Sequence, residues 1–253
     1  MACTRIEHVM GMPVIVDVRD EGVSEGALDP FFAWLRVVDA TFSTYRPDSD
    51  VGRIDRGELD PEDAEPEVRE ILARCDELRG ETGGYFDAHS AGPGRFDPSG
   101  LVKGWSIERG SRILDRLGAR NYSVNAGGDI LVKGGELPSA SWRVGVRHPI
   151  LADAVAAVLD VTDLAVATSG AYERGDHVLD PFTRRPPRGV LSVTVVGPDL
   201  GTADAYATAA FAMGPRGAHW TARLPRGYDA MTILDDRTVL STPGFPATAE
   251  LAA

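Results

Sequence analysis

The sequence lacks the short motifs by which most nucleotide-binding and hydrolytic enzymes are identified. No G-x-G-x-x-G string follows a strand-like segment, and there is no Walker A lysine loop, no G-x-S-x-G and no H-E-x-x-H. The string Gly92-Pro93-Gly94 is not a dinucleotide fingerprint, because its proline removes a backbone donor. A nucleotide bound by this chain must therefore be held by a less familiar arrangement.

Cysteine is also scarce. The two cysteines, Cys3 and Cys75, belong to no C-x-x-C string and no Cys/His cluster, which argues against structural zinc and thiol redox chemistry. Cys75 lies on an apolar stripe with Val68, Ile71 and Leu78. This helical spacing predicts that the Cys75 thiol is buried in the hydrophobic core.

Positive charge and long hydrophobic runs are in short supply as well. Lysine and arginine total 26 against 38 acidic residues, which gives a net charge of −12 and an isoelectric point near 4.8. This balance disfavours nucleic acid and anionic membranes, and a phosphate-bearing ligand would need a bound cation. No hydrophobic segment follows Met1 and no run reaches transmembrane length, so we expect a cytoplasmic protein without membrane insertion.

What is present fits one globular domain over residues 1–253, with 43% hydrophobic and 25% charged residues. Strands and helices do not alternate regularly, so we expect an α+β fold with mixed or antiparallel sheets and packed helices. Helices are predicted from Asp29, from Pro66, over about Val102–Leu117 and over Thr202–Met213. Strand-like segments are Ile6–Val18, Tyr122–Val124, Ile130–Val132, Trp142–Val146, Ala154–Val161, Leu191–Val196 and Ala230–Leu234.

The first candidate site residues are Asp204 and Thr208, in the helix Thr202–Met213. Positions four apart share one helix face, so the carboxylate and the hydroxyl can converge. Two hard oxygens at this spacing suit magnesium, which also keeps waters and substrate phosphates. Alternatively, Asp204 caps the start of the helix and Thr208 only packs.

The second candidate is the string from Asp97 to Gly104, a turn that enters a helix. Free amides at a helix N-terminus attract anions, and Lys103 adds a positive charge in the first turns. A plain Pro-Ser-Gly turn with a surface lysine explains the same residues.

Two glycine-containing strings form the third and fourth candidates. Thr82-Gly83-Gly84-Tyr85-Phe86-Asp87 lets the backbone approach a ligand and offers aromatic rings to a flat one, although a helix C-cap before core aromatics fits equally. Asn125-Ala126-Gly127-Gly128-Asp129 is either a ligand-facing loop or a hairpin turn.

The fifth candidate joins Ser169-Gly170-Ala171-Tyr172 to His177-Val178-Leu179-Asp180-Pro181. His177 can titrate near neutral pH and act as a general base. A lone histidine before a turn is otherwise a hydrogen-bonded structural residue.

Together these strings resemble the FAD:protein FMN transferase (ApbE-like) family in wording and order. The likeness runs from about Ile6 to Phe245. It rests on Met10-Gly11, Phe42 to Ser49, Gly83 to Asp87, Asp97 to Gly104, Asn125 to Asp129, Ser169-Gly170, His177 to Pro181, Ala203-Asp204-Ala205, Thr208-Ala209, Phe211 and Thr242 to Phe245.

The resemblance implies an ApbE-like (T-fold-like) architecture and a set of site residues. It implies magnesium at Asp204 and Thr208, with oxygens from Gly100 and the Ala207 position. It places His177 as a plausible base for the acceptor hydroxyl, beside Asp204 in the catalytic centre. It implies FAD contacts from Met10, Tyr45, Tyr85, Phe86, Asp87, Asp97, Lys103 and Leu179.

Three departures from the family pattern stand out. Met12 replaces the usual threonine after Met-Gly, Glu108 replaces the usual aspartate five residues after the lysine, and the stretch between Asp87 and Asp97 is short.

The activity that the resemblance implies is magnesium-dependent transfer of FMN from FAD to a threonine or serine of an acceptor flavoprotein, through a phosphoester bond, with release of AMP. Two alternatives use the same site. Water in place of the acceptor hydroxyl gives an FAD pyrophosphatase, and a protein that binds FAD without turnover is a flavin carrier.

Overall fold

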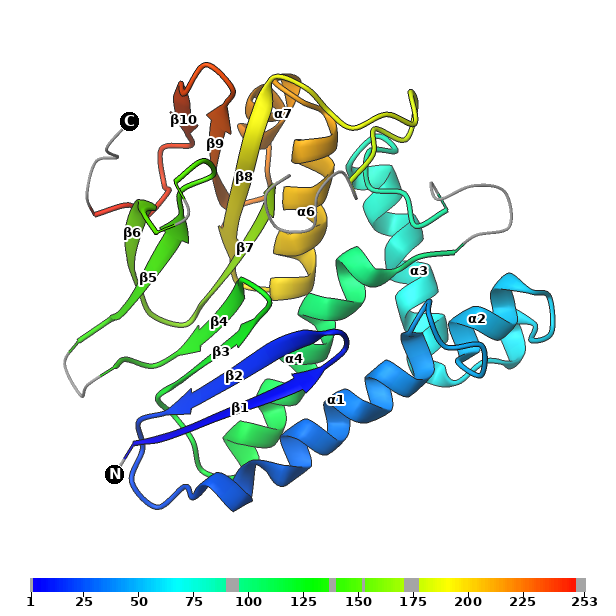
Figure 1. Ribbon diagram of the computed structural model, residues 1–253, viewed down its shortest axis with the longest axis vertical. Coiled ribbons are helices and arrows are strands. Elements are labelled where there is room, and N and C mark those ends of the chain that lie inside the picture. Colours follow the sequence, from blue (N-terminus) through cyan, green and yellow to red (C-terminus); the bar gives the residue numbers. More distant parts are fainter. Residues whose placement is uncertain (1, 90–95, 137–139, 152, 171–177, 249–253) are drawn as a thin grey trace.

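The computed structural model describes residues 2–89, 96–136, 140–151, 153–170 and 178–248 of the chain. An eight-stranded sheet runs through it in the order β1-β2-β3-β4-β7-β8-β9-β10, and every neighbouring pair is antiparallel. Helices pack on one face of this sheet and the hairpin β5–β6 lies toward the other (Figure 1). The α+β class with antiparallel sheets, predicted from the sequence, is confirmed.

The element bounds follow the chain. The strands are β1 (Cys3–Val9), β2 (Met12–Val18), β3 (Tyr122–Ala126), β4 (Asp129–Lys133), β5 (Trp142–Arg147), β6 (Val155–Val161), β7 (Leu164–Gly170), β8 (Val190–Gly197), β9 (Asp229–Leu234) and β10 (Val239–Ser241). The α-helices are α1 (Asp29–Phe42), α2 (Asp50–Asp55), α3 (Pro66–Glu81), α4 (Ser99–Arg116), α6 (Leu200–Ala212) and α7 (Arg216–Thr221), and short 3-10 turns span Glu25–Leu28 and Pro61–Asp63.

The segment Ile6–Val18, predicted as one opening strand, is two strands joined by a tight hairpin, so that prediction is wrong. Met10 and Gly11 form the turn, with φ of 55° and 73°. Positive φ at both central residues gives the turn type whose twist matches a two-residue hairpin. Methionine is an unusual residue for such a turn, so the alternating pattern continues through positions 10 and 11 without a clear turn signal.

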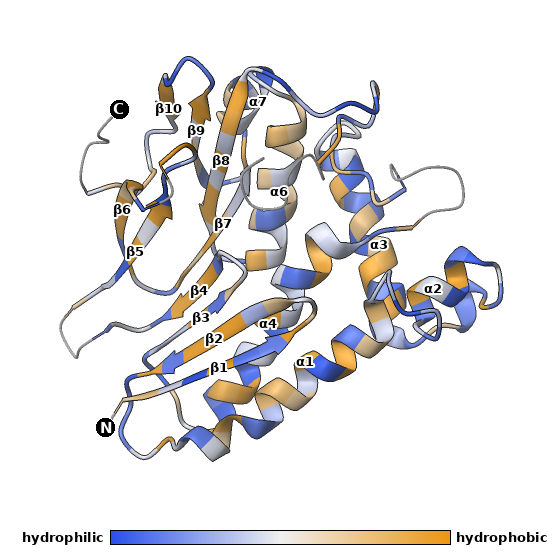
Figure 2. Ribbon diagram, viewed as in Figure 1, coloured by the Kyte–Doolittle hydropathy of each residue, from blue (hydrophilic) through white to orange (hydrophobic). Residues whose placement is uncertain are grey.

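Two hydrophobic clusters hold the layers together. The larger one lies between the helices and the sheet and includes Leu35, Leu78, Cys75 and Leu200, so the predicted buried position of the Cys75 thiol is confirmed. The smaller one lies between the sheet and the β5–β6 hairpin around Trp142 and Leu159. Apolar residues concentrate along the central strands, as Figure 2 shows. Among the described residues, no helix combines the length and the apolar character needed to cross a membrane.

Helix α6 is the central element of the helical layer. It packs against β7, β8 and α4, and every residue of it except Thr208 is buried. Its crossing with α4 is close, because a Cβ on Gly104 would lie 2.6 Å from the backbone of Leu200 and Gly201. This contact brings the first turns of α4 beside the residues of α6 that carry polar side chains.

Candidate active site

A cleft of about 670 Å³ opens where the β1–β2 turn, the end of α1, the segment after α3, the start of α4, the end of β7 and α6 meet. Its walls include most of the residues singled out from the sequence. They are Met10, Tyr45, Tyr85, Phe86, Asp87, Asp97, Gly100, Lys103, Leu179, Asp204 and Thr208. Residues spread over the chain from Met10 to Thr208 thus meet at one site, although most of them are far apart in sequence.

Two predicted residues are not among these walls. Ala207 is fully buried in α6 and does not line the cleft. His177 lies outside the described residues, next to Val178 and Leu179, which do line the cleft.

The inner end of the cleft carries three charged groups in a buried setting. Lys103 Nζ lies 2.6 Å from Asp129 Oδ2 and 3.4 Å from Asp204 Oδ2. The two aspartate side chains are 1% and 4% exposed, so the ions interact with little screening by water. Three separate elements, α4, β4 and α6, contribute the three residues.

Burial is the main reason why the pKa of Asp204 lies well above the ordinary value of a carboxyl group. The negative charge of Asp129 raises this pKa further, and the ammonium group of Lys103 opposes both effects. A carboxyl group in the middle of a buried, alanine-rich helix is costly for folding. A buried carboxyl group with a perturbed pKa that lines a cleft is a candidate for binding or catalysis, and Asp204 meets this description.

Asp204 does not cap the helix. The helix begins at Leu200, and the cap is Asp199, whose side chain accepts a hydrogen bond of 2.7 Å from the Thr202 amide. The alternative reading of Asp204 as an N-cap is therefore wrong, because the helix starts two residues earlier than the pattern predicted.

Hydroxyl groups lie beside the carboxylates. Thr208 Oγ1 and Ser169 Oγ are 3.2 Å apart and share a hydrogen bond between α6 and β7. Gly100 lies at the same place, since a Cβ there would be 3.7 Å from Thr208 Oγ1 and 3.3 Å from the Phe86 ring. The missing side chain keeps the start of α4 close to Thr208.

These oxygens fit a small, hard divalent cation. Within the described part of the chain, Asp129 Oδ2 and Asp204 Oδ2 are buried and accept no hydrogen bond of good geometry, although both lie within ion-pair distance of Lys103. No group of three His, Cys, Asp or Glu side chains forms a metal cage among those residues. Magnesium needs no such cage, because it retains waters and substrate phosphates and uses one or two carboxylates.

The outer end of the cleft is aromatic and open. Tyr45 is 94% exposed, whereas Tyr85 is half-buried and Phe86 is buried, and all three line the cleft. The ring of Tyr45 makes little packing contact with the rest of the fold, so its faces are available to a flat ligand.

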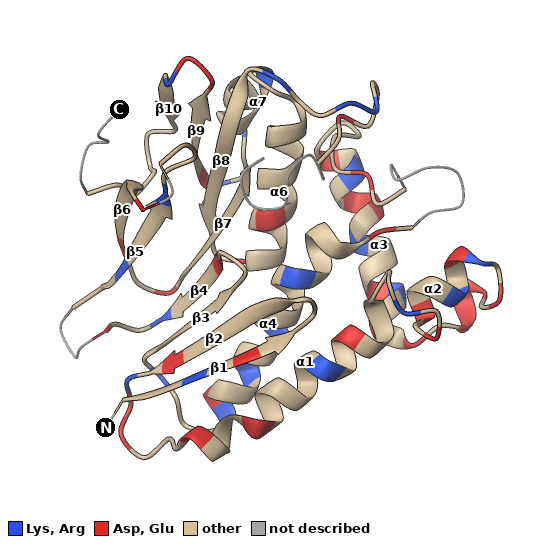
Figure 3. Cartoon of the chain, viewed as in Figure 1, with Lys and Arg blue, Asp and Glu red and all other residues tan. Residues whose placement is uncertain are grey.

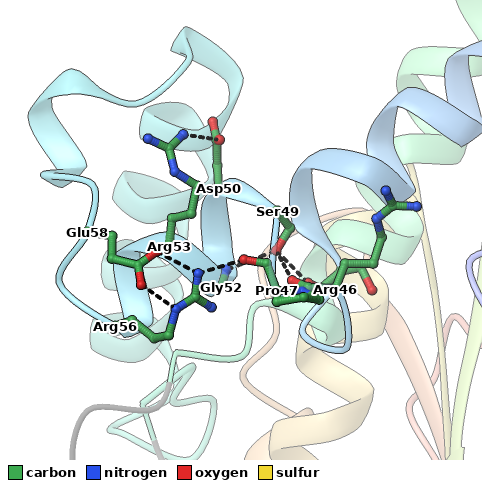
Figure 4. Close-up of polar contacts among 9 residues, drawn as sticks. Arg46, Pro47, Ser49, Asp50, Gly52, Arg53, Arg56 and Glu58 are labelled. Atoms are coloured by element: carbon green, nitrogen blue, oxygen red, sulfur yellow. Dashed lines mark hydrogen bonds and ion pairs between the residues drawn. The ribbon is translucent and has the colours of Figure 1, made fainter.

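The loop that carries Tyr45 is nevertheless well fixed by its neighbours (Figure 4). Ser49 Oγ donates to the carbonyl groups of Ser43 and Arg46, at 2.7 and 2.9 Å, and accepts from the Gly52 amide at 2.9 Å. Arg56 donates to the Pro47 carbonyl at 2.6 Å. The backbone around Tyr45 is thereby ordered before any ligand binds.

The acidic residues on the wall have local roles too. Asp97 Oδ1 accepts from the Ser99 amide at 3.0 Å and starts α4, while Asp87 Oδ1 accepts from the His89 amide at 2.9 Å. In each case the side chain accepts from the amide two residues later, and this local turn fixes the carboxylate on the cleft wall.

Glu108, the residue that departs from the family pattern, supports the site without lining it. Its Oε2 accepts from the Leu200 amide at 3.2 Å, so it satisfies a free amide in the first turn of the helix that bears Asp204 and Thr208 and complements the cap at Asp199. Burial raises the pKa of Glu108, although the Leu200 amide opposes this shift.

Asp129 is the residue whose role could not be inferred from the sequence. It belongs to the glycine-containing string from Asn125, for which the sequence allows either a ligand-facing loop or a hairpin turn. The structure shows a two-residue hairpin between β3 and β4. Its other oxygen, Oδ1, accepts from the Thr168 amide at 3.2 Å and so joins β4 to β7 beside the cleft. An aspartate directly after two glycines was the one feature of the sequence that could have indicated this role. The sequence does not reveal its ion pair, because Lys103 lies on α4, far away along the chain.

A model of the ApbE family matches residues 10–93 and 88–232 of the chain. The FAD:protein FMN transferase of Vibrio cholerae is 30% identical over 207 residues, which cover 78% of this chain and 58% of that protein. The protein of the same name from Treponema pallidum is 32% identical over 203 residues, covering 70% and 56%. The chain therefore spans a little over half the length of these two relatives.

Solved structures show the same fold. The flavin transferase ApbE from Vibrio cholerae superposes with a TM-score of 0.86 at 23% identity, covering 97% of this chain and 98% of that one. The ApbE protein of Thermotoga maritima gives a TM-score of 0.84 at 23% identity, with 96% and 97% covered. The ApbE-like architecture that the sequence motifs implied is confirmed.

Proposed function

We propose, because the chain belongs to the ApbE family, that it transfers the FMN moiety of FAD to a threonine or serine hydroxyl of an acceptor flavoprotein. The hydroxyl oxygen forms a bond to the phosphorus on the FMN side of the pyrophosphate. The bond from that phosphorus to the bridging oxygen breaks, and AMP leaves with that oxygen. The hydroxyl proton passes to a base on the protein.

The observation that carries this proposal is the division of the cleft into a buried polar end and an open aromatic end. Asp204, Thr208 and Lys103 lie at the buried end, where a pyrophosphate can be held away from water. Tyr45 and Tyr85 lie at the open end, where a flavin ring can rest against aromatic faces. A dinucleotide such as FAD has the same two parts, one charged and one flat.

This arrangement supports a set of contacts with FAD. We assign the pyrophosphate to Lys103 and the first turn of α4, whose amides point toward a bound anion. Met10, Phe86, Asp87, Asp97 and Leu179 complete the walls around the flavin-bearing half.

The residues that would hold magnesium are Asp204 and Thr208, with the Gly100 carbonyl in support; Ala207, buried away from the cleft, is left out of this set. When bound, the ion neutralises charge that develops on the phosphate oxygens during transfer. This local cation also explains how a chain with a net charge of −12 accommodates a polyanion. Lys103, paired with Asp129 at 2.6 Å, would supply a second positive charge at this end of the cleft.

We assign the general base to His177. A threonine hydroxyl is a weak nucleophile, and removal of its proton in the transition state contributes roughly a hundredfold or more to such reactions. The support is its place in the sequence two residues before Leu179, which lines the cleft.

The test is a mass measurement on a candidate acceptor flavoprotein after incubation with the protein, FAD and magnesium. We expect the acceptor to gain the mass of one FMN moiety, with AMP released in equal amount, and we expect excess EDTA to stop the reaction. Free FMN with an unmodified acceptor would show the FAD pyrophosphatase instead. Intact FAD that stays bound in the presence of magnesium would show a carrier.

A further inference from the structure

A second hollow of about 530 Å³ lies next to the cleft and shares Tyr85 with it. The helix α7 and the end of α3 form its walls. Three of its lining residues are basic and exposed, namely Arg216, His219 and Arg223, and Trp220 adds an aromatic surface. None of these residues contributes to the flavin site described above.

The charge of this region is opposite to that of the chain as a whole. Residues 205–228 contain no aspartate or glutamate, but they contain Arg216, His219, Arg223 and Arg226. Residues 181–198 also contain no acidic residue, and they carry Arg184, Arg185 and Arg188. In a chain with 38 acidic residues and a net charge of −12, two such stretches form a local basic surface.

The two stretches lie side by side. A Cβ on Gly189 would be 2.7 Å from the Pro215 ring, and one on Gly214 would be 3.0 Å from the Arg188 carbonyl. Both stretches also reach the mouth of the cleft at Tyr85. The hydroxyl of Tyr85 accepts from Arg216 at 2.6 Å, and its ring lies 4.9 Å from that of Phe182.

Most of these arginines have free charges. Among the described residues, Arg184, Arg185, Arg188, Arg223 and Arg226 form no ion pair and no side-chain hydrogen bond, in contrast to Arg5, Arg56 or Arg74 on other surfaces. Figure 3 shows basic residues of the loop before β8 on the same side of the molecule as α7. The acidic residue that lines the hollow, Glu81, already accepts from Arg74 and Tyr206, at 2.8 and 2.7 Å.

We propose that this basic surface binds an acidic segment of the acceptor protein, next to the hydroxyl that receives FMN; the inference rests on the proposed transfer function. Tyr85 lines the cleft, and Phe182 packs against its ring just outside the lining, so an acceptor chain that enters the cleft past Tyr85 also passes Phe182. Phe182 is 65% exposed, so it offers an apolar contact between the two groups of arginines. Free charges at the rim of a binding site raise the association rate and select partners of opposite charge.

The probe is a fluorescein-labelled peptide with one threonine flanked on both sides by aspartates, compared with the same peptide carrying asparagines. We expect the aspartate peptide to bind the intact protein about tenfold more tightly at low salt, and the difference to vanish at high salt as the charges are screened. Arg223→Glu and Arg188→Glu, made separately, should each remove most of this preference. The dissociation constant of FAD should stay within about twofold of the parent value.

Arg143→Glu is the matched control, because Arg143 is exposed on β5, away from α7 (Figure 1). It should keep the full preference for the aspartate peptide. Equal effects of Arg223→Glu and Arg143→Glu would overturn the proposal. Equal binding of both peptides, with inorganic phosphate displacing both at matched ionic strength, would also overturn it and identify a small-anion site.

The same samples separate this inference from the function on which it rests. After addition of FAD and magnesium, a mass gain of one FMN on the aspartate peptide supports both. Charge-selective binding without any mass gain counts against the transfer function and leaves the docking surface in place. A mass gain that is equal for both peptides and unchanged in Arg223→Glu supports transfer and removes the docking surface.

Discussion

The two ends of the cleft are organised by opposite physical means. At the inner end, Lys103, Asp129 and Asp204 are buried and hold one another through charge. At the outer end, Tyr45 is almost fully exposed, and its loop is ordered by hydrogen bonds from Ser49 that involve backbone groups. The stability of the inner end therefore depends on the balance between Lys103 and the two carboxyl groups, whereas the outer end can change with little effect on the fold.

The largest effect is expected at the inner end for Asp204→Ala. This change removes a buried carboxylate from the proposed magnesium site, so FAD turnover should fall by roughly a thousandfold, a loss typical of an essential transition-state charge contact. The melting temperature should not fall, because an unfavourably buried ionisable group has been removed. Activity assays and thermal melts with and without magnesium measure both.

Asp199→Ala is the control for Asp204→Ala, since Asp199 caps the same helix. It should cost about 1 kcal/mol of stability and leave turnover nearly unchanged. If both variants lost activity to the same extent, the role of Asp204 would be structural.

Lys103→Met tests the charge balance at the inner end of the cleft. It leaves two buried carboxylates facing each other without their cation, and removal of one partner from a buried ion pair costs about 3 to 5 kcal/mol. Denaturant unfolding should show this loss in EDTA and a partial recovery in magnesium. Lys133→Met, at the other lysine of the chain, is the control and should change stability little; equal losses would contradict the proposed charge network.

The outer end is tested by Tyr45→Ala. A ring that is 94% exposed contributes nothing to the core, so the melting temperature should stay the same. The affinity for FAD should fall about tenfold, as expected when one aromatic stacking contact is lost. Fluorescence titration of FAD measures this, with Leu151→Ala as the control at another exposed apolar position; an unchanged affinity would exclude Tyr45 from the flavin site.

The smallest effect concerns Glu108, which supports the inner end from behind. Its pKa is raised by burial, and Asp199 adds to this shift while the Leu200 amide, Lys133 and Arg112 oppose it. The folded state thus favours the protonated form, so the contribution of Glu108 to stability is largest below the ordinary carboxyl pKa and falls as the pH rises through the raised value.

Glu108→Gln keeps an oxygen that can accept from the Leu200 amide and removes the ionisable group. We expect a small gain in stability at pH 8, on the order of 0.5 kcal/mol, and no change at pH 4. Unfolding curves at the two pH values provide the measurement. A loss of stability at pH 8 would mean that the ionised carboxylate is the better cap.

The sequence predicted the fold class and most of the cleft walls, for reasons that can be named. Helix starts at Asp29 and Pro66 were visible because proline is tolerated in the first turn, and the α+β class followed from the irregular order of strands and helices. The family motifs placed Tyr45, Lys103 and Asp204 in one site, and the structure brings them to the same cleft.

The remaining features depend on contacts between distant parts of the chain, and hydrophobic periodicity indicates only local secondary structure. The ion pair between Lys103 and Asp129 joins a helix to a strand, and each residue alone has an ordinary local explanation. Helix α2 and strand β10 were missed because they are short, with six and three residues, and carry too few apolar positions to show a period.

The hairpin turn at Met10 has one more consequence. A residue with a side chain at a φ of 55° is less stable there than glycine or asparagine, by roughly 1 kcal/mol. Yet Met10 places its thioether on the cleft wall, 3.7 Å from the hydroxyl of Ser106. Selection for robustness alone would replace it, so Met10→Asn should raise the melting temperature while weakening FAD binding. A rise in melting temperature together with weaker FAD binding would identify this turn as a place where stability is exchanged for contact with the ligand.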